Sequence, residues 1–260
     1  MSDTKVKGIV DIVVLLDTSG SMQECIDGVK TCIGSFVNGL EAKGANNESP
    51  IKDWRMKVCG YKDHEADGEN WFSDNPFVSD VASVQAQIAA ANMQASGGGD
   101  EPESLLDALF KIAKMEQSGV QEGADPNKWR ARGTSARAVI FFTDATFKDP
   151  MTIPEAAGGG LQDAKNAITG AKILLFGFCP ETDKYCLLGG IGKAQLDFYV
   201  SPDACPAVAG LGKGGEEGNA AAQAAVEALA SISSDRAGFT KIMEQLAKTL
   251  SASVHTEKIA

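Results

Sequence analysis

Hydrophobic positions along the chain follow two periods that alternate from one end to the other. Near-continuous apolar runs predict buried strands at residues 8–16, 54–61, 136–145, 172–179 and 195–200. Stripes that repeat every three or four residues predict helices at residues 22–41, 80–92, 104–115, 161–171, 181–191, 219–232 and 237–254. Strands alternating with helices predict, through right-handed crossovers, one doubly wound, mostly parallel α/β sheet of Rossmann-like type with helices on both faces.

The chain reads as a single domain over residues 1–260, with its core at about residues 8–254. Its length and its 43% content of hydrophobic residues are sufficient for one large core. No internal repeat and no linker divides it. An acidic loop at residues 63–71 should lead to a short edge strand, and a loop rich in Pro and Gly is expected at residues 201–218.

Short oxygen-bearing side chains follow the predicted strands at several points. Asp17, Ser19 and Ser21 come directly after the first strand, Asp144 closes a later strand, and Asp100 lies in a glycine loop before a helix. Ligands of such sheets bind at the carboxyl ends of the strands, so we expect these side chains to gather there. Carboxylate and hydroxyl oxygens are hard ligands, which favours Mg²⁺, with Mn²⁺ and Ca²⁺ as alternatives.

These residues carry a resemblance to a known family. The segments "DTSGSM", "GGGDEPES" and "FFTDA", in this chain order, resemble the von Willebrand factor type A (VWA) family with its metal-ion-dependent adhesion site, the MIDAS. The resemblance covers about residues 8–254. It implies that Asp17, Ser19 and Ser21 lie at the metal and that Asp144 holds it through water.

The central loop departs from the commonest pattern of the family. Many members carry a threonine there, whereas this chain has the GGGDxPE form of a subset. Asp100 is the candidate ligand, at a predicted helix N-cap with Pro102 and Glu103 in the first turn, and Glu103 or Ser104 would serve instead if the helix begins elsewhere. A carboxylate in place of threonine would neutralise the ion further and weaken its attraction for a partner's carboxylate.

The resemblance implies protein binding without catalysis. A partner's Asp or Glu would complete the metal's coordination shell, and binding can couple to movement of the last helix. The predicted partner contacts are Gly20, Met22, Gly99 and Glu101. Intracellular relatives act as adaptors in complexes, including complexes with ring-shaped ATPases. Three alternatives stay open: an extracellular adhesion or surface protein, a metal-dependent hydrolase, and a structural subunit in which the metal only braces the loops.

Charge and composition narrow the setting. The formal net charge is −11, from 35 acidic and 24 basic residues, which argues against nucleic acid and anionic membranes as partners. No signal peptide and no membrane-spanning run is expected. The six cysteines show no C-x-x-C pair, so we expect reduced thiols and a cytoplasmic protein.

Three weaker signals are assigned to ordinary structure. The acidic segment at residues 62–69 is interpreted as a solvated loop, although it could hold a second cation. The glycines of residues 210–215 lack the strand that a nucleotide-binding motif requires. Neither His64 nor His255 is placed as a general base.

Overall fold

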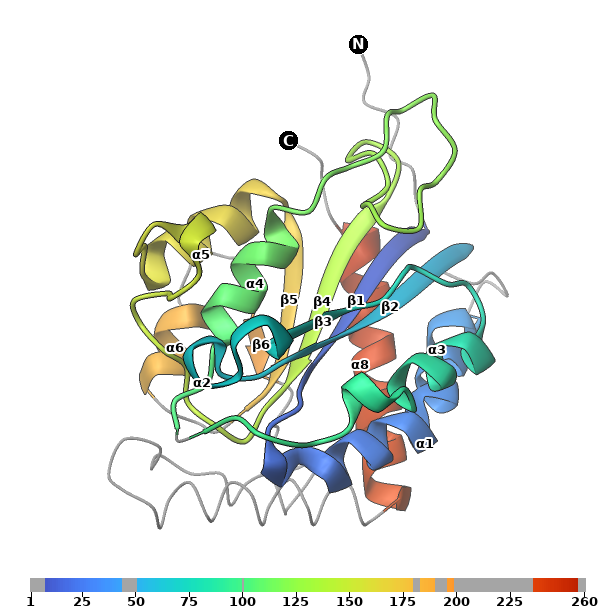
Figure 1. Ribbon diagram of the computed structural model, residues 1–260. Coiled ribbons are helices and arrows are strands. Elements are labelled where there is room, and N and C mark those ends of the chain that lie inside the picture. Colours follow the sequence, from blue (N-terminus) through green and yellow to red (C-terminus); the bar gives the residue numbers. More distant parts are fainter. Residues whose placement is uncertain are drawn as a thin grey trace.

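The computed structural model describes residues 8–43, 51–99, 101–179, 183–189, 196–198 and 236–256. These residues form a six-stranded sheet in the order β3-β2-β1-β4-β5-β6 (Figure 1). The strands are β1 (Ile9–Asp17), β2 (Asp53–Tyr61), β3 (Phe72–Asp74), β4 (Ala136–Phe142), β5 (Ile173–Phe178) and β6 (Leu196–Phe198). Every neighbouring pair is parallel except β2 with β3, which confirms the predicted doubly wound, mostly parallel α/β fold.

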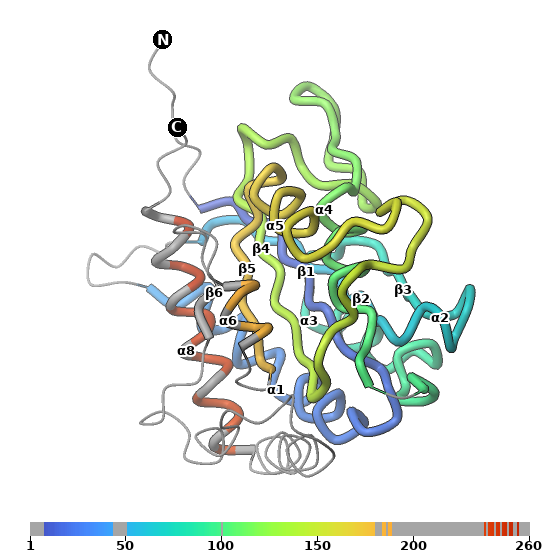
Figure 2. Tube along the Cα trace, turned by 90° about the vertical axis from the view of Figure 1, so that its left-hand side faces the viewer, coloured from blue at the N-terminus to red at the C-terminus, as the bar shows by residue number. Residues whose placement is uncertain are grey.

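Helices cover both faces of the sheet (Figure 2). One face carries α1 (Gln23–Glu41), α3 (Val81–Ile88) and α8 (Arg236–Thr256). The other carries α4 (Leu105–Ala113), α5 (Leu161–Gly170) and α6 (Asp183–Gly189). The remaining short elements are α2 (His64–Asp67) and the 3₁₀ turns η1 (Gly20–Met22), η2 (Gly68–Asn70), η3 (Ala91–Met93) and η4 (Pro154–Ala156).

Strand β1 lies between β2 and β4 and is buried on both faces. Val10, Ile12 and Val14 point into the core shared with α1 and α8, whereas Val13 and Leu15 point into the core shared with α4 and α5. Alternating side chains of a strand face opposite sides of the sheet, so a strand buried on both sides needs apolar residues at every position. This constraint explains the continuous apolar run in the sequence, and it fixes the strand's end at a buried Asp17.

One predicted element boundary is wrong. The sequence placed Pro102 and Glu103 in the first turn of a helix, but α4 begins only at Leu105. The backbone N–H of Glu103 donates to the carbonyl of Thr146 at 2.9 Å, and the N–H of Lys148 donates to the carbonyl of Glu103 at 2.8 Å. Because its backbone N–H and carbonyl are bonded to the loop after β4, Glu103 lies outside the helix.

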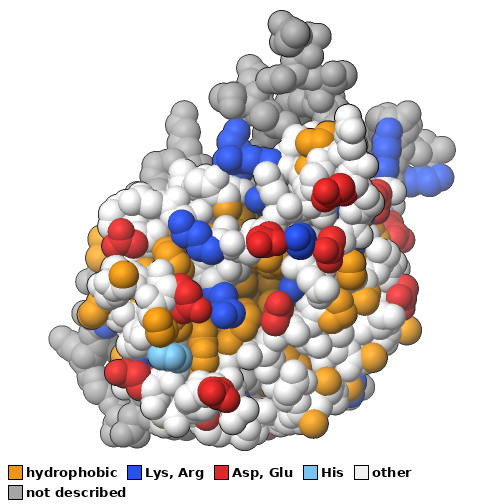
Figure 3. All heavy atoms as spheres, turned by 45° about the horizontal axis from the view of Figure 1, so that its top comes forward, with side chains coloured by type: hydrophobic (Ala, Val, Ile, Leu, Met, Phe, Trp, Pro, Cys, Tyr) orange, Lys and Arg blue, Asp and Glu red, His pale blue; other side chains and the backbone are white. Residues whose placement is uncertain are grey.

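Other expectations fall partly or wholly outside the described residues. These are the glycine motif at residues 210–215, the loop at 201–218 and the helix at 219–232. Of the cysteines, Cys25, Cys32 and Cys59 are buried free thiols, as expected. Among the described residues, none of the helices is both long and apolar enough to cross a membrane. On the face in Figure 3, basic and acidic side chains are interspersed.

A buried ion pair ties the amino-terminal part of the sheet to the loop before β4. Asp11 on β1 is fully buried, and Arg55 on β2 donates to both of its carboxylate oxygens at 2.8 Å. Arg55 also donates to the carbonyls of Asp125 and Lys128, and the N–H of Arg130 donates to Asp11 at 2.7 Å. Charged groups far from solvent are thus fully hydrogen-bonded, which burial requires.

Replacing Arg55 with methionine should lower the free energy of unfolding by about 3 kcal/mol, because the buried Asp11 would keep only the longer ion pair with Arg130, at 3.5 Å. Urea denaturation followed by circular dichroism measures this. As a control, Lys128→Gln breaks only the exposed pair with Glu116 and should change stability far less. Equal losses in both variants would contradict a structural role for the buried pair.

Candidate metal centre

Three loops meet at the carboxyl edge of the sheet. They are residues 17–22 after β1, residues 96–104 before α4 and residues 143–148 after β4. The N–H of Ser96 donates to the carbonyl of Thr18 at 2.9 Å, and the N–H of Gly20 donates to the carbonyl of Gly97 at 3.2 Å. Together with the pairing of Glu103 described above, these bonds hold the three loops side by side through their backbones.

Asp17 is fully buried at the centre of this edge. Its Oδ1 accepts a hydrogen bond from the N–H of Ser19 at 2.8 Å, and its Oδ2 accepts one from the Thr143 hydroxyl at 2.7 Å. Burial, followed by the nearby charge of Asp144, raises the pKa of Asp17 to about 7, against the lowering effect of the bonds from Ser19 and Thr143. The carboxylate is held in a fixed orientation, but its charge is poorly compensated.

Asp144 and Ser21 come together beside it. Asp144 lies two residues beyond the end of β4 and is only 4% exposed. Burial raises its pKa, and a hydrogen bond with the Ser21 side chain opposes that rise. Within the described part of the chain, its Oδ2 has no hydrogen-bond partner. A buried carboxylate oxygen without a donor is costly, and a bound cation would relieve that cost.

Glu103 supplies the third carboxylate. It is 4% exposed, and its Oε2 also finds no hydrogen-bond partner among the described residues. Burial, and then the charges of Asp17 and Asp63, raise its pKa to about 9. Three acidic groups close enough to perturb one another would all be ionised at neutral pH only beside a compensating positive charge.

Gly98 allows the backbone of the central loop to lie close to Glu103 and Ser19. Its φ is +93°, and a Cβ atom there would lie 2.6 Å from Glu103 Oε1 and 2.6 Å from the Ser19 Cβ. Any other residue would therefore collide with both groups. The glycine places the Glu103 carboxylate and the Ser19 side chain on either side of one backbone position.

The predicted ligands Asp17, Ser19, Ser21 and Asp144 thus share one edge of the sheet. Asp100, the first choice for the central loop, lies outside the described residues. Of its two alternatives, Ser104 is fully buried and accepts a hydrogen bond from the N–H of His64 at 3.0 Å. Glu103, the other alternative, is the described central-loop residue with a buried carboxylate oxygen that lacks a hydrogen-bond partner.

The predicted partner contacts divide into two groups. Gly20, Gly99 and Glu101 are exposed around the site, and Glu101 also accepts a hydrogen bond from the N–H of Thr146 at 2.7 Å. Met22 is only 1% exposed and packs in the core beneath α1, so its assignment as a contact is wrong. Its side chain follows the apolar stripe of the helix, which faces the sheet.

Sequence reasoning missed Thr143 and Lys148. Thr143 orients Asp17, and its place just before Asp144 is the only signal that could have identified it. Lys148 contacts Asp63 and Glu65 of the acidic loop, with Nζ–oxygen distances of 2.6 Å to each. The ammonium therefore compensates the negative charge of this loop. This agrees with the interpretation as an ordinary acidic loop and not with a second cation site.

The donor set fits a hard divalent cation. Asp17, Glu103 and Asp144 supply carboxylate oxygens, and Ser19 and Ser21 supply neutral hydroxyls. Among the described residues, no three His, Cys, Asp or Glu side chains are gathered tightly enough to form a metal cage on their own. A cation at this edge would therefore need further oxygens, which the two serine hydroxyls would offer.

No protein-family model matches the chain, and no curated protein matches it. Among solved structures, it is similar to proximal thread matrix protein 1 from the mussel byssus, at 12% identity and a TM-score of 0.41, over 66% of this chain and 36% of that one. A second structure of that protein is described as having a zinc-occupied MIDAS motif. It is 18% identical with a TM-score of 0.40, over 65% of this chain and 38% of that one. Likenesses this distant carry no argument about family or function.

Replacing Glu103 with glutamine should weaken Mg²⁺ binding by more than about 100-fold, because even residues that only support metal ligands cost about 10- to 100-fold when removed. Isothermal titration calorimetry on metal-free protein measures this. The matched control is Glu101→Gln, which changes an exposed carboxylate two residues away and should bind Mg²⁺ nearly as the wild type does. Equal affinities for both variants would exclude Glu103 as a ligand.

The stability of the metal-free protein should fall as pH rises from about 4 to about 9. Asp17 and Glu103 have pKa values raised above their ordinary values, so the folded protein holds protons that the unfolded chain releases, and this advantage is lost as pH passes the folded pKa values. Mg²⁺ should therefore stabilise the protein more at about pH 8 than at about pH 5. Urea denaturation with and without Mg²⁺ checks this, and a gap independent of pH would contradict it.

Proposed function

We propose that this chain is a VWA domain whose MIDAS holds a divalent cation, most simply Mg²⁺, and uses it to bind another protein. The observation that carries the proposal is the pair of uncompensated oxygens, Asp144 Oδ2 and Glu103 Oε2, on buried carboxylates next to Asp17. Asp17, Ser19, Ser21 and Glu103 would hold the ion, with Asp144 acting through water as the family resemblance implies.

The protein's own residues prepare the site for such a ligand. Thr143 and the N–H of Ser19 fix Asp17 in one orientation, so little side-chain freedom is lost when a cation binds. When bound, the ion would supply a Lewis-acidic position for an outside oxygen. Gly20, Gly99 and Glu101 are exposed around it, which leaves room for a partner's Asp or Glu side chain to approach.

The charge of the site limits how strongly it attracts that carboxylate. Three carboxylates around a doubly charged cation leave a formal charge of −1, from +2 minus 3. A partner's Asp or Glu would then bind through direct coordination of the ion, because the site as a whole does not attract a negative charge over a long range. Glu103 thus takes over the neutralising role that the sequence assigned to Asp100, and we expect binding to depend on a desolvated contact around the ion.

The proposal is for binding and not for catalysis. The Nδ1 of His64 lies 3.0 Å from the Thr152 hydroxyl, and its ring packs against Trp71, so this side chain serves the loop structure. We propose a cytoplasmic adaptor, which the buried reduced thiols Cys25, Cys32 and Cys59 support. A ring-shaped ATPase as partner is an analogy with the family only.

A second candidate function is a structural metal that only braces the loops. The backbone bonds joining the three loops favour it, because a cation there would tie together segments that already contact one another. The two candidates differ in one respect: a bracing metal would change stability without changing partner binding.

A pull-down from native lysate, with Mg²⁺ or with chelator, separates these candidates. Wild type, Glu103→Gln and Ser21→Ala are compared with Glu122→Gln, whose exposed carboxylate caps the loop of residues 117–135, away from the site. Partner binding should be lost with chelator and reduced at least about 10-fold in both site variants, while the control retains it. A partner retained in all conditions would leave the metal a structural role at most.

A further inference from the structure

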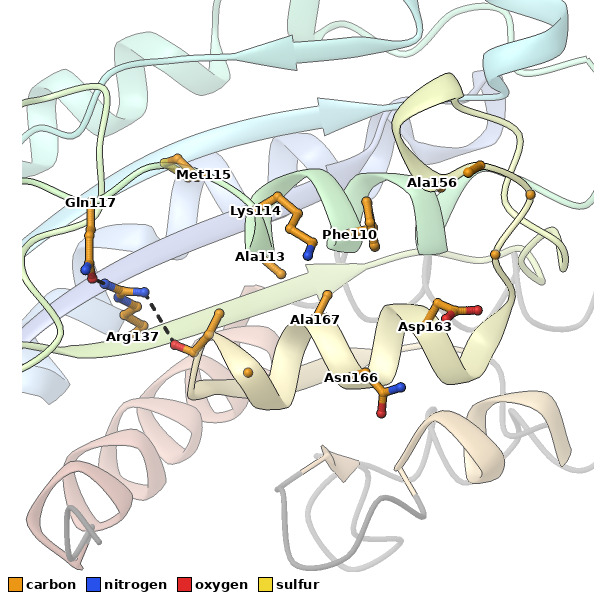
Figure 4. A pocket seen from close by; sticks show the side chains of 15 residues that line it. Phe110, Ala113, Lys114, Met115, Gln117, Arg137, Ala156, Asp163, Asn166 and Ala167 are labelled. Atoms are coloured by element: carbon orange, nitrogen blue, oxygen red, sulfur yellow. Dashed lines mark hydrogen bonds between the residues drawn. The ribbon is translucent and has the colours of Figure 1, made fainter.

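A groove lies between α4 and α5, on the opposite side of the sheet from α1 and α8 (Figure 4). Its volume is about 710 Å³, within the range of small-molecule sites. It extends from the loop at residues 156–159 to Arg137 at the start of β4. Arg137 begins a strand whose far end leads to the candidate metal centre, so the groove reaches the other edge of the sheet.

Small side chains form much of the walls, although the exposed lining is more polar than apolar. Phe110 and Ala113 from α4 face Ala167 and Gly170 from α5, and Met115 lies beside them. Residues of this size leave space between two helices that larger side chains would otherwise fill. The cavity therefore offers a compact ligand an apolar contact at Phe110, Ala113 and Ala167 within a mostly polar lining.

A buried cation lies at one end. Arg137 is only 5% exposed, and its Nη2 donates to Gln117 Oε1 at 2.7 Å and to the Arg130 carbonyl at 3.0 Å. Among the described residues, no carboxylate forms an ion pair with it, and its Nε has no hydrogen-bond partner. Burial lowers the pKa of Arg137 to about 10, with a further lowering by the charge of Arg132, against the opposing charge of Asp11.

The other charged side chains make the groove an anion site. Lys114, exposed at its rim, has its ammonium 5.3 Å from the centre of the Phe110 ring and likewise pairs with no described carboxylate. Asp163 is the acid that lines the groove, and its Oδ2 accepts a hydrogen bond from the N–H of Gly160 at 3.0 Å. Figure 4 places Asp163 toward the opposite end from Arg137. Two cations and one acid leave a formal charge of +1.

We propose that this groove binds a small organic carboxylate, whose charged end lies toward Arg137 and Lys114 and whose apolar body lies along Phe110, Ala113 and Ala167. A single negative charge matches the formal charge of the lining, which favours a monocarboxylate over a phosphate. Small-molecule sites combine apolar contacts with convergent polar groups, and the lining of this groove supplies both. The groove is separate from the candidate metal centre, so this proposal does not depend on the proposed function.

Isothermal titration calorimetry on the full chain tests this with 3-phenylpropionate as the probe. The neutral alcohol 3-phenylpropan-1-ol has the same apolar body without the charge. The carboxylate should bind with a saturable heat at millimolar concentrations, and the alcohol at least about 10-fold more weakly. Only the carboxylate can form charge-assisted hydrogen bonds with Arg137 and Lys114. Equal binding of the two probes, or no saturable heat, would overturn the proposal.

Matched variants locate the binding. Lys114→Gln removes an exposed cation of the groove, and Ala167→Leu fills the groove with a residue that favours helix. Both should weaken 3-phenylpropionate at least about 10-fold. Lys111→Gln removes a cation one turn away on α4 that lies over Phe72 and outside the groove, and it should leave binding unchanged. A loss as large in Lys111→Gln as in Lys114→Gln would contradict the assignment.

Discussion

The burial of Asp17 at the end of the central strand is the constraint on which the site depends. A strand covered by helices on both faces carries apolar residues until it leaves the sheet, and Asp17 is its last residue. Its carboxylate is fully buried and must find donors, which Thr143 and the N–H of Ser19 provide. Because those donors come from two loops, satisfying one carboxylate positions the whole edge of the sheet.

The same burial places carboxylates of like charge close together at the site. Asp144 and Glu103 lie near enough to Asp17 to raise its pKa or have theirs raised by it, and each keeps one buried oxygen without a donor. The described groups alone do not compensate this charge. A bound cation would compensate it. Relief of the repulsion in the metal-free form would then contribute to the free energy of metal binding. Recognition of a partner would then follow from the coordination position that these five side chains leave open.

Most of the fold could be predicted from the sequence because β1, β4 and β5 are buried on both faces and so read as continuous apolar runs. Asp17, Ser19, Ser21 and Asp144 could be predicted because the ends of parallel strands meet at one edge. Glu103 could not be ranked above Asp100 in this way. Its position at the site depends on backbone pairing with Thr146 and Lys148, a contact between distant segments that leaves no periodic pattern. The groove likewise depends on how helices pack on the sheet.

A crystal of the protein grown with Mn²⁺, examined by anomalous diffraction, tests the central claim most directly. Mn²⁺ takes the same oxygen ligands as Mg²⁺ and scatters anomalously. The account predicts one strong peak bounded by Asp17, Ser19, Ser21 and Glu103, with Asp144 beside it. A peak at the acidic loop of Asp63 and Glu65, or no peak at the sheet edge, would contradict it.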